Sequence, residues 1–201
     1  MKKSIIFILT MTLTFAFITG CSKEDTNPPA NSSTNPTEND KSEPAENEDS
    51  TNSADITVDD ILNAIKSAYG ESYLPNIEIT PEFLEAEFGL TPDMYEAVKA
   101  EQPMIGTHAD RVVIVKAAEG RTDDVEAALN TARENKMKDT LQYPMNIPKI
   151  NATKIVRNED FVCFLLLGSI NENMDSTEEE LKQFAENEVE KAVNAFHDLF
   201  K

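Results

Sequence analysis

Phe161-Val162-Cys163-Phe164-Leu165-Leu166-Leu167 is the most apolar segment of the expected folded part of this chain, and the rest of the fold can be built around it. A short polar loop, Asn158-Glu159-Asp160, joins it to the segment from Thr153 to Arg157. Such a loop between two strand-like runs predicts an antiparallel β-hairpin. We therefore expect 153–157 and 161–168 to be neighbouring strands.

Outward from this hairpin, the next strand is Arg111-Val112-Val113-Ile114-Val115-Lys116, which is β-branched and apolar at both odd and even positions. This pattern indicates a strand covered on both faces. A long helix begins at 120–122 and completes a β-α-β unit between strands 111–117 and 153–157, whose crossover should be right-handed. If 161–167 lies antiparallel between them, it is the central strand. The expected fold is α+β, with a small antiparallel or mixed sheet of three to four strands around a split β-α-β core.

The other helices are recognised by their first residues, where a capping side chain precedes proline or acidic residues. The starts are Thr57-Val58-Asp59-Asp60, Thr80-Pro81-Glu82, Thr91-Pro92-Asp93 and Asp175 to Thr177. The apolar faces are Phe83, Leu84 and Phe88 on the second helix, Met94, Tyr95 and Val98 on a short third helix, and Leu181, Phe184, Ala185, Val189, Ala192, Val193, Phe196, Leu199 and Phe200 on the last. We expect the long helices to pack on one face of the sheet and the N-terminal helices on the other.

The N-terminus is typical of a bacterial lipoprotein signal peptide at residues 1–20. Lys2-Lys3 precede an apolar run of 14 residues, Ile5 to Ile18, and the small Gly20 stands before Cys21. The run is shorter than the roughly 20 residues that span a bilayer as a helix. We expect cleavage before Cys21 and an S-diacylglycerol on its thiol, with acylation of the new α-amine left open. The alternative is an uncleaved membrane anchor that ends in an incidental cysteine.

Residues 21–55 are expected to form a lipid-anchored, disordered acidic linker. From Ser22 to Asp55 there is no Ile, Leu, Val, Met or aromatic residue, so nothing there can bury apolar surface to offset chain entropy. A flexible chain of this length spans roughly 30 Å. The expected single α+β domain, residues 56–201, should therefore lie close to the membrane.

The charge of the domain limits its partners. It holds 28 acidic and 14 basic residues, a net charge of −14 with His neutral. Nucleic-acid binding depends on Lys and Arg to neutralise phosphates, so we expect no nucleic-acid partner. The expected partners are the membrane, through the lipid anchor, and an envelope protein or a small ligand.

No catalytic, cofactor or metal site is predicted from motifs. Cys163 lies in the apolar stretch and is expected to be a core side chain. His108 and His197 lack the paired ligand spacing of zinc sites, and we expect no cofactor. The acidic clusters, Asp59-Asp60, Asp123-Asp124 and Asp175 with Glu178 to Glu180, stand at helix starts and are explained by capping and the helix dipole. Tyr73 and Tyr143, near prolines, are the best candidates for an exposed aromatic patch.

Several stretches carry a family resemblance: Phe83 to Leu90, Ala109 to Ala117, Gly120 with Val125 and Leu129, Tyr143-Pro144, Phe161-Val162, and Ala195 to Phe200. In this order, behind a lipoprotein leader, they resemble a Firmicutes lipoprotein family known as domain-of-unknown-function family 4358. The resemblance covers nearly all of residues 56–201. It implies a Gram-positive cell and an envelope location, and it implies no activity or catalytic residue.

These observations favour a membrane-anchored extracytoplasmic lipoprotein, lipid-anchored to the outer face of the cell membrane, that acts as a non-enzymatic binding or interaction module of the cell envelope. The alternative is a small envelope hydrolase with an unrecognised acid/base site. A third reading is an accessory subunit that docks through its last helix. An exposed apolar patch along Phe184, Val189 and Phe196 would favour docking through that helix, and its burial against the sheet would remove this reading.

Overall fold

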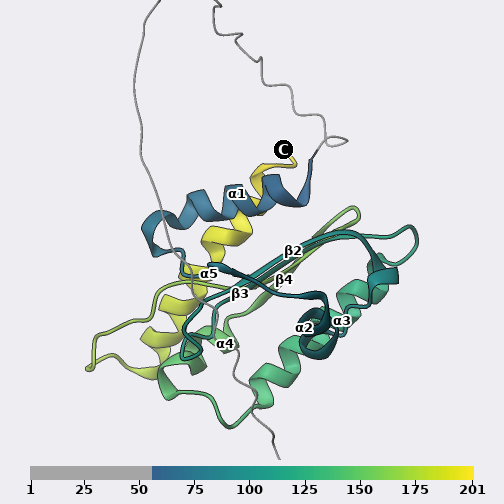
Figure 1. The fold of residues 1–201 in the computed structure, drawn as a ribbon. Helices are drawn as coiled ribbons and strands as arrows, with labels where there is room; N and C mark the ends of the chain where they lie inside the picture. The colour runs from purple at the N-terminus through teal and green to yellow at the C-terminus, as the bar shows by residue number, and fades with distance from the viewer. Residues whose placement is uncertain (1–55) are drawn as a thin grey trace, which may run out of the picture. The chain divides into compact units, whose positions relative to one another are not determined.

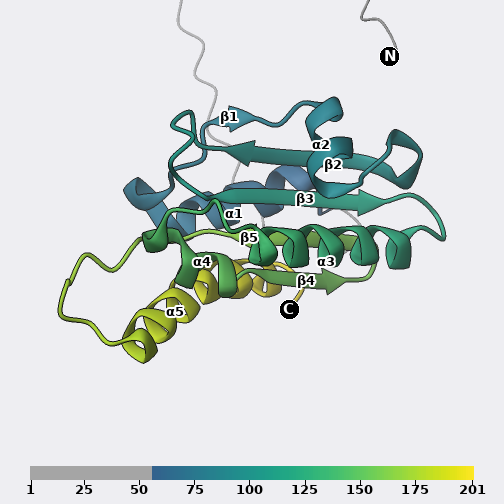
Figure 2. The same ribbon diagram turned by 90° about the horizontal axis from the view of Figure 1, so that it is seen from below.

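The computed structural model describes residues 56–201, which form an α+β domain around an antiparallel sheet (Figure 1). Within these residues the sheet has five strands in the order β1-β2-β3-β5-β4 (Figure 2). The strands are β1 Ile77–Glu78, β2 Tyr95–Gln102, β3 Arg111–Ala117, β4 Lys154–Asn158 and β5 Phe161–Leu166. The α-helices are α1 Val58–Tyr69, α2 Pro81–Phe88, α3 Thr122–Lys138, α4 Ile147–Asn151 and α5 Glu178–Asp198. Short 3-10 turns are η2 Gly70–Ser72, η3 Pro92–Met94 and η4 Pro144–Asn146.

The predicted split β-α-β core is confirmed. β5 pairs antiparallel with both β3 and β4, so Cys163 stands opposite Ile114 on one side and Val156 on the other. β3 and β4 therefore run parallel to each other, with α3 in the connection between them. The hairpin of β4 and β5 turns at Glu159, which adopts a positive φ of 51°.

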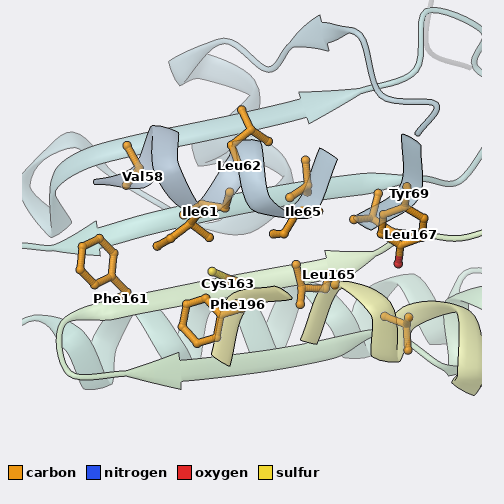
Figure 3. Close-up of a cluster of buried hydrophobic side chains, with 14 of the residues drawn as sticks. Val58, Ile61, Leu62, Ile65, Tyr69, Phe161, Cys163, Leu165, Leu167 and Phe196 are labelled. Carbon is orange, nitrogen blue, oxygen red and sulfur yellow. The ribbon is translucent and has the colours of Figure 1, made fainter. Parts of the chain in front are cut away.

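Both faces of β5 are buried, which explains why its sequence is apolar throughout. Alternate residues of a strand point to opposite faces. Cys163 and Leu165 join the core under α1 and α5, which also contains Ile61 and Phe196 (Figure 3). Phe164 and its alternate neighbours face a second core beneath α2, α3 and α4. The sheet is thus the middle layer of three (Figure 1).

The predicted distribution of helices over the two faces is wrong. The long helices α3 and α5 lie on opposite faces, and each is paired with an N-terminal helix: α1 with α5, and α2 with α3. The physical reason is that β3 and β5 are apolar on both faces. Each face needs one long amphipathic helix to exclude water from it.

The prediction of a short third helix and of only three to four strands is also wrong. The segment after Thr91-Pro92-Asp93 makes one 3-10 turn and then enters β2, which pairs with β3 and with β1. β2 consists largely of Ala, Glu, Lys and Gln, which favour helices in isolation. Pairing with β3 supplies its backbone hydrogen bonds, and this tertiary contact overrides local propensity.

α1, α2 and α5 begin where the caps predicted, but the side chain of Thr80 makes no capping hydrogen bond, and one apolar residue of α2 is not buried. Thr57 and Asp60 form a capping box at α1, and Thr177 and Glu180 form another at α5. Leu84 and Phe88 of α2 are buried as expected, but Phe83 is 58% exposed. A helix of eight residues has a narrow buried stripe, and Phe83 falls outside it.

Among residues 56–201, no helix is long and apolar enough to cross a membrane. The predicted signal peptide (1–20), the linker (21–55) and the lipidation site Cys21 lie outside the described residues.

Candidate functional site

Three adjoining pockets open at one end of the sheet, where β2 and β5 end and β3 and β4 begin. Each of them is lined in part by the segment 143–150, which includes η4 and most of α4. Figure 2 shows α4 at this end, beside the loop that leads into α5. We treat this end of the domain as the candidate site.

The first pocket, which we call the polar cavity, has a volume of about 200 Å³. It is lined by Gly106, Thr107, His108, Ala109, Arg111, Lys136, Leu141, Gln142, Tyr143, Asn146, Ile150 and Leu166. Most of these residues come from the loop before β3, the end of α3 and the connection to α4, and the others are Arg111 of β3, Ile150 of α4 and Leu166 of β5. The lining contains two permanent cations and no carboxylate.

Glu87 of α2 holds the two cations of the polar cavity in place. Its Oε1 accepts hydrogen bonds from Arg111 Nε at 3.2 Å and from Lys136 Nζ. The three side chains are about one-fifth exposed, so the ion pairs are only partly screened by water. A second carboxylate, Asp139, lies nearby. Hydrogen bonds from Leu141 N and Gln142 Nε2 lower its pKa, and the charge of Lys136 helps to lower it.

A buried ion pair anchors α4 behind the pockets. Lys149 Nζ lies 2.9 Å from Asp110 Oδ2, and both residues are almost inaccessible, at 3% and 1% exposure. Next to this pair, Asn146 is also buried, and its Nδ2 donates to the carbonyl of Thr107 at 2.9 Å. Asn146 Oδ1 accepts no hydrogen bond within the described part of the chain.

The other two pockets share Pro144, Pro148 and Leu181 and together form what we call the apolar groove, between α4 and the first turns of α5. Their volumes are about 280 and 600 Å³. Met145, Met174 and Phe184 line the smaller one, and Ile147 lines the larger. The charged side chains on the larger one are Glu178, Glu179, Lys182 and Glu186. The rim of the groove is therefore acidic.

Exposed apolar side chains gather at this end of the domain. Of the eleven large apolar residues that are exposed within 56–201, five line the three pockets: Leu141, Tyr143, Met145, Ile147 and Met174. Met174 and Leu141 are 96% and 90% exposed. Exposed apolar surface gathered in one place marks interaction sites more often than scattered residues do.

Only one of the two tyrosines predicted to form an exposed aromatic patch lies at the candidate site. Tyr143 is 53% exposed, as predicted, and lines the polar cavity. Tyr73 is half-buried, and its hydroxyl donates to Glu101 Oε2 at 3.0 Å, so it is not part of the same patch. Burial and the charge of Glu101 raise the pKa of Tyr73 far above its ordinary value.

The thiol and the histidines do not meet. Cys163 is fully buried in β5, and burial raises the pKa of its thiol. His108 lines the polar cavity, whereas His197 is exposed near the end of α5. Within the described residues, no three His, Cys, Asp or Glu side chains are grouped closely enough to hold a metal ion.

The last helix is not an open docking surface along its length. Val189 and Phe196 are buried against the sheet, so the predicted apolar stripe belongs to the core. This burial excludes the interpretation in which an accessory subunit docks through the stripe. Phe184 alone among the three diagnostic positions remains partly accessible, in the apolar groove. The groove depends on α4, a helix that periodicity did not reveal because it has only five residues.

The candidate site lies at the opposite end of the sheet from the point where the chain enters the domain. Figure 3 shows Val58 and Phe161 at one end of the core and Tyr69 and Leu167 at the other. β5 runs from the hairpin at Phe161 toward the pockets, over a length of about 20 Å. Ile56 and the start of α1 are therefore at the hairpin end.

Comparison with known families finds one match, to a domain whose function has not been assigned. No curated protein and no solved structure matches the chain. The match begins in α1 and ends after β5, so it includes the whole sheet, the polar cavity and α4 and excludes α5. The chain contains a domain of unknown function, DUF4358, at residues 68–167.

Proposed function

We propose that this protein is a Firmicutes lipoprotein, anchored by Cys21 to the extracytoplasmic face of the cell membrane, that binds an envelope protein through its apolar groove. The observation that carries the proposal is the gathering of exposed apolar side chains around the pockets at one end of the sheet. Its supports are the composition of the groove, its acidic rim and its position at the end of the sheet opposite to the start of α1.

The groove suits a protein segment with apolar side chains flanked by Lys or Arg. Its floor is formed by Ile147, Pro148 and Leu181, which favour apolar contact. Its rim carries Glu178, Glu179 and Glu186 against one lysine. Electrostatic complementarity of this kind selects cationic partners and speeds their encounter. Met145 and Met174 are flexible side chains that can adapt to the bound segment.

The position of the groove is consistent with a tethered binding module. An anchor at Cys21 would connect to the domain through Ile56, at the hairpin end of β5. The groove lies at the other end of the sheet, so a partner bound in it would not cover Ile56. The domain's net charge of −14 also disfavours contact with anionic lipid headgroups.

The alternative of an envelope hydrolase with an acid/base site receives no support from the pockets. A carboxyl group that acts as a general acid near neutral pH needs a raised pKa. In residues 56–201 the carboxyl pKa values that are displaced are displaced downward, as at Asp139, where hydrogen bonds from Leu141 N and from Gln142 lower the pKa. A binding role uses the observed apolar surface directly.

The test is site-specific photo-crosslinking of the full-length protein in the cell that makes it. A photoreactive residue at Met174 or at Ile147 should crosslink one defined envelope protein. The same residue at Glu119, an exposed position at the hairpin end, is the matched control. The crosslinked peptide should contain apolar residues beside Lys or Arg, and Glu179→Lys should lower the yield. Equal crosslinking from Glu119, or no effect of Glu179→Lys, contradicts the proposal.

The anchor is tested separately. Cys21→Ala should abolish metabolic labelling by a radioactive fatty acid and should leave precursor in the membrane or release the protein to the medium. Cys163→Ala is the control, because the buried thiol of Cys163 should not be lipidated. A Cys21→Ala protein that still carries lipid would exclude this anchor.

A further inference from the structure

The polar cavity is an electrostatic exception in this domain. The surface as a whole carries twice as many acidic as basic residues, yet the lining of this cavity contains Arg111, Lys136 and His108 and no carboxylate. Glu87, which pairs with both cations, stands outside the lining. A ligand in the cavity would therefore meet the cations rather than their counter-ion.

The cations keep donor groups that the protein does not use. Arg111 donates from Nε to Glu87 and from Nη1 to the carbonyl of Asp110 at 2.8 Å. Its Nη2 donates to no residue in the described range. A guanidinium has five N–H donors in a planar fork, which matches the oxygens of carboxylate and phosphate groups. Lys136 adds a second charge from the end of α3.

Asn146 supplies the second, independent observation. It lines the cavity, only 2% of its surface is exposed, and its Oδ1 accepts no hydrogen bond from the described residues. Its orientation is set, because Nδ2 donates to the Thr107 carbonyl. A buried acceptor without a donor is unfavourable, so most such groups in proteins are satisfied by protein, water or ligand. A ligand that carries an O–H or N–H group would satisfy it.

We infer that the polar cavity is a binding site for a small carboxylate or phosphate anion that also carries a hydroxyl or amine donor. The anion binds to Arg111 and Lys136, and the donor binds to Asn146. The volume of about 200 Å³ is smaller than the roughly 300 Å³ at which pockets for drug-sized ligands begin. This restricts the ligand to a few heavy atoms. The site is separate from the apolar groove and does not depend on the proposed protein partner.

The experiment is an NMR titration of the ¹⁵N-labelled full-length chain in a non-ionic detergent and a phosphate-free buffer. Four probes separate the two requirements: lactate has a carboxylate and a hydroxyl, acetate has only the carboxylate, inorganic phosphate has both charge and donor, and glycerol has hydroxyls without charge. Lactate and phosphate should shift the amide signals of Thr107, Ala109 and Gln142 saturably. Acetate should bind more weakly, and glycerol should cause no saturable shift.

Two lysines of α3 provide a matched pair of variants. Lys136→Gln should weaken lactate binding about ten- to a hundredfold, the factor expected when a charge-assisted hydrogen bond is lost. Lys138→Gln makes the same change of charge two residues away, at a side chain that is 71% exposed, and should leave binding unchanged. Gln142→Glu adds a negative charge to the cavity and should also weaken binding. Because Gln142 is only half-buried, this variant keeps the test valid if Lys136→Gln does not fold.

Three results would overturn the inference. The first is the absence of saturable shifts with lactate and phosphate. The second is an equal loss of affinity in Lys136→Gln and Lys138→Gln, which would indicate nonspecific attraction to charge. The third is equal affinity for acetate and lactate, which would remove the role of Asn146.

Discussion

Removal of Lys149 should destabilise the domain severely, because it leaves the carboxylate of Asp110 buried without its cation. The two side chains are 3% and 2% exposed and lie 2.9 Å apart. Such a pair need not stabilise a fold relative to apolar residues, since both ions lose their hydration on burial. Breaking it by removal of one partner nevertheless costs about 3–5 kcal/mol. A domain of this size is stable by about 5–15 kcal/mol, so the loss is a large part of the total.

The substitution Lys149→Met keeps the length of the aliphatic chain and removes the charge. We expect it to lower the unfolding free energy by about 3–5 kcal/mol in urea denaturation followed by circular dichroism. Lys138→Met, at an exposed lysine, should stay within about 0.5 kcal/mol of the parent protein. Because Lys149 belongs to α4, the variant should also loosen the wall of the apolar groove.

A double-mutant cycle separates the pair from the packing of each residue. Asp110→Asn alone should also destabilise, since it leaves the buried ammonium of Lys149 without a counter-ion. The double variant should cost less than the sum of the single variants by about 1–3 kcal/mol. A cost below about 1 kcal/mol for Lys149→Met, or strict additivity in the cycle, would show that the two buried charges do not depend on each other.

Three other predictions follow from buried groups. Gly168 has a φ of 123°, and a Cβ added there would lie 2.5 Å from Glu188 Cβ. Gly168→Ala should therefore lower the unfolding free energy by about 2–6 kcal/mol in urea denaturation. The control Gly106→Ala, whose added Cβ meets nothing within 4 Å, should be near neutral. Burial acts to raise the pKa of Glu188, but hydrogen bonds from Lys191 and the Ser169 amide hold it below its ordinary value. The stability that this depressed pKa contributes is present above the pKa of Glu188 in the unfolded chain and is lost as the pH falls through its pKa in the folded domain. The unfolding free energy should therefore drop less between about pH 7 and pH 3 in Glu188→Gln than in the parent protein, and an equal drop would count against this role of Glu188. In a Cys21→Ala protein, iodoacetamide should label Cys163 only as the domain unfolds, because the thiol is fully buried and burial raises its pKa. Rapid labelling of the native protein would show instead that β5 opens locally.

Local sequence patterns were sufficient to predict those features of the fold that depend on residues close together in the chain. The hairpin of β4 and β5, the burial of Cys163 and the capping boxes at Thr57 and Thr177 were all predictable. In each case the pattern lies within a few residues: a short polar loop, an apolar run, or a hydroxyl three positions before an acidic side chain. The same holds for Tyr143, whose neighbouring proline indicated an exposed loop.

The candidate site could not be predicted in this way. Asp110 and Lys149 are 39 residues apart, and so are Thr107 and Asn146, whose hydrogen bond closes the polar cavity. Lys136 and Glu87 are 49 residues apart. The spacing of these residues in the sequence does not indicate that they are in contact, because each contact follows from where β3, α3 and α4 lie relative to one another. The sequence indicates no ligand spacing around His108, and its place in a cation-lined cavity depends on those contacts.

Hydrophobic periodicity and capping chemistry act over one or two turns of chain, so the sequence predicts the central two-sided strand, the split β-α-β core and the amphipathic helices that cover it. Three features follow only from contacts between distant segments: Tyr95–Gln102 is a strand, α3 and α5 lie on opposite faces, and the cavity and groove meet around α4. A strand made of helix-favouring residues gains its hydrogen bonds from a partner strand. Likewise, a site assembled from separate loops exists only after the sheet has brought them together.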